Sequence, residues 1–144
     1  MTAESSGLDF WAIVEGRALP PPSARLLNWR FVGLDDAGVL HCAFEPTEAF
    51  LNPAGFVRGG ILAAMLDEAM GPVVAATSRE KVLAQTLEMK TSYFRGARPG
   101  KILGEGRVLH RGGEIVFLEG RLLDLQHNLI AAACPTARII SGRS

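Results

Sequence analysis

Asp67 is the side chain best placed for chemistry, because it lies on an unusual face of a predicted helix. Apolar residues recur at i, i+4 spacing over 61–74, and Asp67 lies roughly 150° from the centre of that stripe. The rest of its face is small and allows a second subunit or a substrate to approach closely: Gly60, Ala63, Ala64 and Gly71. A carboxylate there can act on water as a general base or attack as a nucleophile. An ordinary helix-surface aspartate or a structural ion pair is the other interpretation.

The glycine pair at the start of the same helix offers a second kind of chemistry. The first N–H groups of a helix have no partner inside the helix and carry partial positive charge. Gly59 has no side chain, so a carbonyl group could approach its N–H, which would stabilise a developing oxyanion. A plain helix N-terminus with a flexible turn is the alternative interpretation.

The elements that must position these groups follow from periodicity and turn residues. A short helix is predicted over 8–16, an extended connector at 20–22, and a hairpin of strands over 26–34 and 39–45. The long helix runs over 59–71 and ends or kinks at Pro72, which has no N–H to donate. Four strands follow over 81–94, 102–110, 114–125 and 129–140, with Gly104 and Gly106 loosening one strand and Pro135 demoting part of the last.

This order predicts an α+β domain with one long helix and a curved antiparallel sheet of five to six strands. Short turns join the later strands, so those strands must be antiparallel neighbours. Residues 1–144 form one domain, with the N-terminal helix and connector at about 1–24. A single helix cannot cover such a sheet, so we expect a homo-oligomer.

Composition narrows the function classes. Fifteen basic and fifteen acidic residues give no net charge, which argues against nucleic-acid binding. The sequence shows no signal peptide and no apolar run that approaches about 20 residues, so we expect a cytoplasmic protein outside the membrane. Cys42 and Cys134 lie in apolar runs and are expected to be buried, reduced thiols. The three histidines lack the spacing of metal ligands, so no metal is expected.

The central pattern Asn52-x-x-Gly55-x-x-x-Gly59-Gly60, followed by Leu66-Asp67-x-Ala69, resembles the hot-dog-fold acyl-CoA thioesterases of the phenylacetic-acid-pathway (PaaI-like) type. The stretch 86–100, with Tyr93 and Arg95, looks like the strand and turn that follow in that family, and Arg111-Gly112 looks like a later turn. The likeness runs over about 26–140. The sequence departs from the family at one position, where Arg58 replaces a histidine. Arginine cannot accept a proton at neutral pH, so only a donor or charge role could survive there.

The resemblance implies a hot-dog fold with its active site at a dimer interface. Asp67 would be the reacting carboxylate and Asn52 would position water or substrate. Gly59 and Asp67 would come from one subunit, and Thr86 from its partner. Arg58 and Gly60 would bind the thioester carbonyl or the phosphates of coenzyme A. Arg95 and Arg111, with Arg98 and Lys101, would form a loose basic set. An acyl pocket would be lined by Phe56, Met65, Met70 and Tyr93.

The expected function is hydrolysis of an acyl-CoA thioester to free acid and coenzyme A by an Asp-assisted water. No bound cofactor is implied, since coenzyme A is part of the substrate, and the assembly would be a homodimer or homotetramer. A non-catalytic acyl-CoA or lipid-binding module is the alternative that Arg58 favours. A hot-dog hydratase or dehydratase is a third, although no histidine occupies the central motif. The sequence leaves open the acyl preference and whether Asp67 is base or nucleophile.

Overall fold

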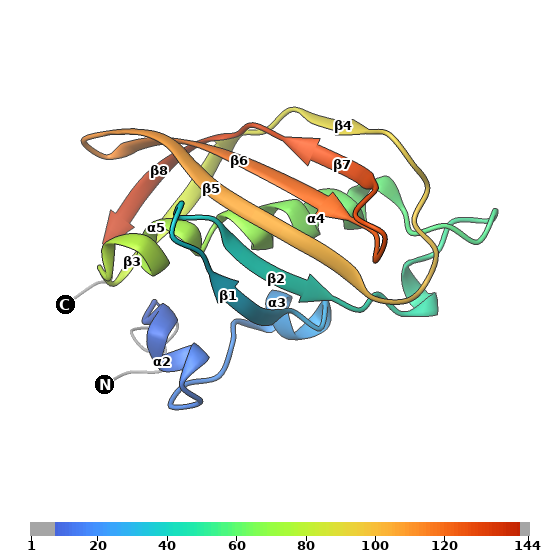
Figure 1. The fold of residues 1–144 in the computed structure, drawn as a ribbon, viewed down its shortest axis with the longest axis horizontal. Coiled ribbons are helices and arrows are strands. Elements are labelled where there is room, and N and C mark those ends of the chain that lie inside the picture. Colours follow the sequence, from blue (N-terminus) through green and yellow to red (C-terminus); the bar gives the residue numbers. More distant parts are fainter. Residues whose placement is uncertain (1–7, 142–144) are drawn as a thin grey trace.

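The computed structural model describes residues 8–141 as one long helix packed on an antiparallel sheet (Figure 1). The helices are α2 (Phe10–Val14), α3 (Pro22–Leu26), the 3-10 turn η1 (Glu48–Phe50), α4 (Gly59–Met70) and α5 (Val73–Ser78). The strands are β1 (Arg30–Leu34), β2 (Leu40–Phe44), β3 (Val82–Glu88), β4 (Thr91–Tyr93), β5 (Ile102–Gly112), β6 (Ile115–Leu123), β7 (Leu129–Ala133) and β8 (Thr136–Ser141). This arrangement confirms the α+β hot-dog fold.

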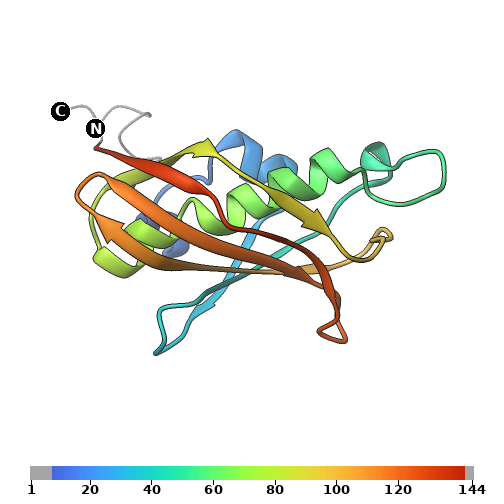
Figure 2. The same ribbon diagram turned by 90° about the horizontal axis from the view of Figure 1, so that it is seen from above.

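Helix α4 forms the centre of the core, as its apolar stripe predicts. The stripe is buried against the sheet through Leu62, Met65, Leu66, Ala69 and Met70. Figure 2 shows the helix running along one face of the sheet. Pro72 interrupts the helix, and α5 then continues for six residues until Arg79 takes a left-handed conformation. The segment Gly59–Ser78 is long and apolar enough to cross a membrane, but half of its apolar window is buried in the domain, so it is the core helix.

The described part of the chain forms one eight-stranded sheet, more strands than the five to six predicted. Two predicted strands are each divided. The segment 81–94 becomes β3 and β4, and 129–140 becomes β7 and β8. Pro135 lies between β7 and β8, where it has no N–H for the ladder. Strand β6 therefore pairs with β8 at its start and with β7 at its end. Strand β3 pairs in turn with β8, and β4 pairs with β7.

Three glycines of the sheet let α4 lie close to it. A Cβ at Gly106 would come within 2.2 Å of the Ala69 carbonyl oxygen, and one at Gly120 within 2.6 Å of the Met70 side chain. A Cβ at Gly104 would meet the Cys42 sulfur of β2 at 2.8 Å and the Ala69 Cβ of α4 at 3.3 Å. The prediction that Gly104 and Gly106 loosen their strand is therefore wrong, because β5 is continuous and these residues provide room for the helix.

The N-terminal segment, residues 8–29, packs beside α5 and the hairpin β1–β2. Helix α2 confirms the predicted helix over 8–16, and its N-cap Asp9 accepts a hydrogen bond from the Ala12 N–H. The Trp11 indole N–H donates to the Ala76 carbonyl of α5 at 3.2 Å. The predicted connector at 20–22 instead opens helix α3, because Pro22 occupies the first helical position, where a missing N–H costs nothing. Strand β1 accordingly starts at Arg30 and not at residue 26.

Candidate active site

Asp67 and Thr86 meet on the exposed side of α4. The Thr86 hydroxyl, from β3, donates a 2.6 Å hydrogen bond to Asp67 Oδ1. Asp67 is exposed and Thr86 is half-buried, so the pair lies at the surface of one chain. The expectation that Thr86 reaches Asp67 from a partner subunit is corrected by this contact, because β3 of the same chain already runs beside the helix. The second carboxylate oxygen of Asp67 accepts no hydrogen bond from residues 8–141.

Glu68 is a second carboxylate at this place, and the sequence motif did not single it out. The Ser23 hydroxyl of α3 donates a hydrogen bond to Glu68 Oε1. Partial burial raises the pKa of the Glu68 carboxyl, the Ser23 hydroxyl opposes that rise, and the charge of Asp67 adds to it. The contact joins the N-terminal segment to α4. The sequence held one signal for Glu68: on the helix it lies closer to the apolar stripe than Asp67 does, so it was the carboxylate more prone to burial.

The start of α4 offers free backbone donors. Neither Gly59 nor Gly60 donates its N–H to an acceptor within residues 8–141. The Tyr93 hydroxyl donates to the Gly59 carbonyl at 2.8 Å, and the Tyr93 ring lies within 3.3 Å of where a Gly59 Cβ would be. Gly60 has open space at the corresponding position. A carbonyl oxygen can therefore approach these N–H groups beside the Tyr93 ring.

Gly59 and Asp67 of one chain are too far apart to serve one carbonyl group. Eight residues of α-helix separate them, which corresponds to about 12 Å along the axis. A thioester carbonyl spans less than a quarter of that length. The expectation that Gly59 and Asp67 of the same subunit form one site is therefore wrong.

The loop before α4 is held by Asn52. Its Oδ1 accepts hydrogen bonds from the Ala54 and Phe56 N–H groups, so the amide organises the turn that leads to the helix. This corresponds to the ordinary turn interpretation of an Asn-Pro pair, and its side-chain oxygen is not free for water. Arg58 is the N-cap residue of α4, and its side chain is exposed.

Part of the predicted basic set gathers in an open cleft near the start of α4. We call it the basic cleft; Phe56, Arg95, Arg98 and Lys101 line it, together with the acidic Asp124. The Arg98 guanidinium lies 4.6 Å from the centre of the Phe56 ring. Arg111 does not belong to this set, because it lies at the other end of β5, about 30 Å along the strand from Lys101. There it forms an ion pair with Glu80 at 2.9 Å.

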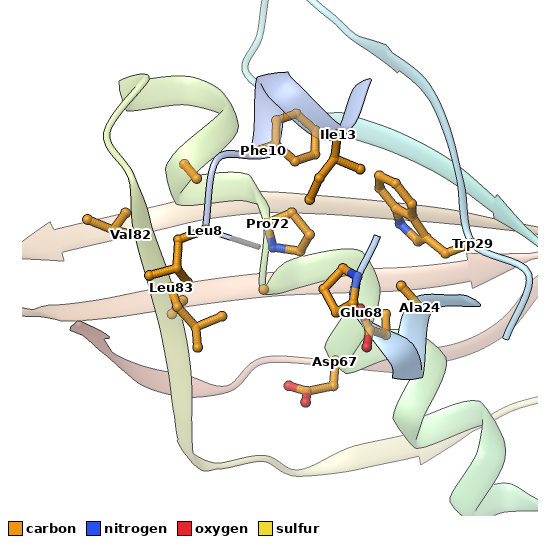
Figure 3. A pocket seen from close by; sticks show the side chains of 14 residues that line it. Leu8, Phe10, Ile13, Ala24, Trp29, Asp67, Glu68, Pro72, Val82 and Leu83 are labelled. Atoms are coloured by element: carbon orange, nitrogen blue, oxygen red, sulfur yellow. The ribbon is translucent and has the colours of Figure 1, made fainter. Parts of the chain in front are cut away.

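An apolar pocket opens beside Asp67, on the side away from Gly59. We call it the Asp67 pocket (Figure 3); it has a volume of about 140 Å³. The N-terminal segment, the end of α4, α5 and β3 line it, through residues that include Phe10, Ile13, Ala24, Pro72, Ala84 and Glu68. Met65 and Met70 cannot line the acyl pocket that was expected from Phe56, Met65, Met70 and Tyr93, because both are buried in the core of the chain. Met65 and Met70 are in the core at 0% and 1% exposure, and Tyr93 is half exposed.

No group of three or more His, Cys, Asp or Glu side chains in the described ranges has an arrangement that could hold a metal ion.

Comparison with known proteins shows that Gly59, Asp67 and Thr86 lie in a part of the chain that matches a protein family. A family model described as the thioesterase superfamily matches residues 54–131, which include Gly59, Asp67 and Thr86. A phenylacetic acid degradation-related protein of Ralstonia eutropha JMP134, described as a candidate thioesterase, has a structure similar at a TM-score of 0.84. The two chains are 34% identical, with 90% of this chain and 98% of that one covered.

Two further similarities are weaker. A Deinococcus radiodurans protein described as a candidate esterase is 26% identical over 129 residues, which cover 88% of this chain and 79% of the relative. The structure of a Streptococcus mutans UA159 protein, solved with acetyl-CoA bound, is similar at a TM-score of 0.70 and 24% identity. That match covers 81% of this chain and 92% of the other, and it shows that the two proteins share a fold.

Proposed function

The chain belongs to the thioesterase superfamily, and we propose that it hydrolyses acyl-CoA thioesters with a water molecule that Asp67 activates. The observation that carries the proposal is the Thr86–Asp67 hydrogen bond on an exposed helix face next to an apolar pocket. Thr86 holds one carboxylate oxygen, which leaves the other to accept a proton from water. The acetyl-CoA bound to the structurally similar S. mutans protein supports a coenzyme A thioester as the substrate.

The proposed site is shared between two chains. Because about 12 Å of helix separates Gly59 from Asp67, Gly59 of one chain works with Asp67 and Thr86 of a second. The small exposed face of α4, with Gly60, Ala64 and Asp67, allows two such helices to approach closely. Leu87 in β3 and Phe94 directly after β4 are exposed, and they provide apolar surface for the contact between the two chains.

The reaction is an addition followed by an elimination. The water oxygen forms a bond to the thioester carbon while its proton passes to the Asp67 carboxylate. The carbonyl oxygen becomes an oxyanion, which accepts a hydrogen bond from the Gly59 N–H at the helix N-terminus. The oxyanion then collapses, the C–S bond breaks, and the thiolate of coenzyme A leaves and takes the proton from Asp67.

The basic cleft suits the phosphates of coenzyme A. Arg95, Arg98 and Lys101 bring three positive charges to one opening near the start of α4, against the single negative charge of Asp124. Phe56 adds an aromatic face beside Arg98. Arg58 is the exposed N-cap residue of α4, so it adds positive charge at the helix start, next to Gly59.

A thiol-release assay over acetyl-, hexanoyl-, phenylacetyl- and palmitoyl-CoA tests the proposal. We expect turnover of at least one thioester, and Asp67→Asn should lower kcat by about a hundredfold or more, because the general base is lost. No turnover with any of the four would reject hydrolysis. Tight acyl-CoA binding without turnover would favour the binding-module alternative, which the exposed Arg58 supports.

Mixed dimers test whether the site is shared. Gly59→Pro removes the N–H at a helix position that tolerates proline, and Gly59→Ala keeps the N–H as the matched control. A one-to-one co-expression of inactive Gly59→Pro and inactive Asp67→Asn chains should restore about a quarter of the wild-type activity, since each mixed dimer has one intact site. Absence of any recovery in isolated mixed dimers would overturn the shared site.

A further inference from the structure

We infer that the N-terminal segment forms the acyl-binding wall of the active site, so that the chain supplying Asp67 also binds the acyl group. The coenzyme A portion then lies on the chain that supplies Gly59. The inferred ligand is an apolar acyl end of about six carbon atoms, by comparison with a dry cavity of about 150 Å³ that binds benzene. This inference rests on the proposed thioesterase function and assigns its substrate class.

The first argument is where the Asp67 pocket opens. Asp67 is itself a lining residue, and Figure 3 shows it at the edge of the pocket with its carboxylate directed toward β3. An acyl group whose carbonyl carbon is near Asp67 therefore has its tail at the pocket mouth. The pocket lies toward α5, and the basic cleft lies near the opposite end of α4. The Asp67 pocket and the basic cleft therefore lie near opposite ends of α4.

The second argument is the chemistry of the pocket wall. Leu8, Phe10 and Ile13 of the N-terminal segment line the pocket together with Val82 and Leu83 of β3 (Figure 3). The volume of about 140 Å³ matches a ring or a short chain and not a long fatty acid. Such apolar walls stabilise a hydrocarbon group by removing its surface from water.

The third argument is the charge at the pocket. Asp67 and Glu68 are the charged side chains that line it, and both are acidic. A second carboxylate at the far end of the acyl group would lose its hydration and would meet no basic side chain among the residues that line the pocket. The pocket therefore selects monocarboxylic acyl groups over dicarboxylic ones of the same length. Ser23, by donating to Glu68, holds the α3 wall against the catalytic helix.

An acyl-length series tests the substrate class. We expect kcat/KM to rise from acetyl- to hexanoyl-CoA and to fall again at dodecanoyl-CoA. Adipoyl-CoA, which equals hexanoyl-CoA with a terminal carboxylate, should be a poorer substrate than hexanoyl-CoA by at least about tenfold. A flat profile, or equal rates for adipoyl- and hexanoyl-CoA, would overturn the inference while leaving thioesterase activity in place. Failure of every thioester would instead reject the proposed function.

Two substitutions test the pocket itself. Ala84→Leu fills the pocket from β3 and should lower the hexanoyl-to-acetyl ratio of kcat/KM by about tenfold. Leu83→Ala enlarges the pocket at a partly exposed position that the fold tolerates, and it should move the optimum to a longer chain. Ala37→Leu, in the exposed β1–β2 turn, is the matched control and should leave the ratio unchanged. An unchanged optimum in both pocket variants would overturn the inference.

The chain assignment has its own test in the mixed dimer of Gly59→Pro and Asp67→Asn chains. Its one intact site takes Asp67 from the Gly59→Pro chain. Adding Ala84→Leu to that chain should lower the hexanoyl-to-acetyl ratio, whereas adding it to the Asp67→Asn chain should not. The reverse pattern would place the acyl wall on the chain that supplies Gly59 and would overturn the assignment.

Discussion

The Thr86 hydroxyl donates a 2.6 Å hydrogen bond to Asp67 Oδ1 and so joins strand β3 to helix α4 within one chain. The contact fixes the rotation of a carboxylate on an otherwise small and exposed helix face. Asp67 is then a group with one oxygen held and one oxygen free. This asymmetry is what a general base needs if it is to receive a proton from one direction.

Thr86→Val should lower kcat with little change in KM. The variant keeps the shape of the side chain but removes the hydroxyl, so Asp67 loses its orientation, and we expect a fall of about tenfold or more. Steady-state kinetics with the best acyl-CoA provide the measurement. Thr86→Ser retains the hydroxyl and should recover most of the activity. A loss in Thr86→Ser as large as in Thr86→Val would assign Thr86 a packing role only.

Gly106→Ala should strongly destabilise the fold. The added Cβ would be placed 2.2 Å from the Ala69 carbonyl oxygen, which belongs to a helix backbone that cannot move alone. We expect a loss of about 3 kcal/mol or more in the free energy of unfolding, measured by urea denaturation. Gly112→Ala in the same strand is the control, since its nearest neighbour would be 3.6 Å away. Equal stability of the two variants would show that α4 does not need this glycine.

Glu68→Gln should stabilise the protein near neutral pH. Burial raises the pKa of Glu68, so its neutral form is favoured in the folded state, and ionisation above that pKa costs stability. Glutamine mimics the neutral form and can still accept from Ser23. The variant should therefore melt higher than wild type at pH 7 to 8, and the difference should shrink as the pH falls below the unfolded value of about 4.3. A difference that grows on acidification would have the wrong sign for this mechanism.

The two thiols should differ sharply in reactivity. Cys42 is buried, and burial raises the pKa of its thiol to about 12, whereas Cys134 is exposed. We expect Ellman's reagent to titrate one thiol in the native protein at pH 8 and two after denaturation. Cys134→Ser should abolish the native reaction and Cys42→Ser should leave it intact. Rapid labelling of Cys42 in the folded Cys134→Ser variant would contradict the packing of β2 against α4. The expectation that both thiols are buried is already wrong for Cys134.

Local patterns predicted the fold where one physical cause dominated. The i, i+4 apolar rows of α4 and the missing N–H of Pro72 were sufficient to predict the helix and its interruption. The strand break at positions 89–90 had no local signal, because residues 81–94 alternate without interruption, whereas Pro135 predicted an edge or a bulge near the place where β7 ends and β8 begins. The role of Gly106 was also hidden, since its cause is the distant carbonyl of Ala69.

The candidate site shows the same limit. Asp67 and Gly59 were predicted from local spacing, but their mutual distance follows only from the helix being continuous between them. The Thr86 contact depends on where β3 lies, and β3 is placed by its pairing with β8 at the end of the chain. Glu68 and its pocket depend on the N-terminal segment folding back over α4. Such long-range neighbours cannot be derived from periodicity.

The position of the N-terminal segment has a consequence for how such a protein can be altered. The segment lies outside residues 54–131, the part that matches the thioesterase superfamily, yet it lines the pocket beside Asp67. The catalytic helix and the wall that faces it are thus separate stretches of the chain. Chimaeras that exchange only residues 8–29 between relatives should carry acyl preference from one protein to another while the hydrolytic machinery stays untouched.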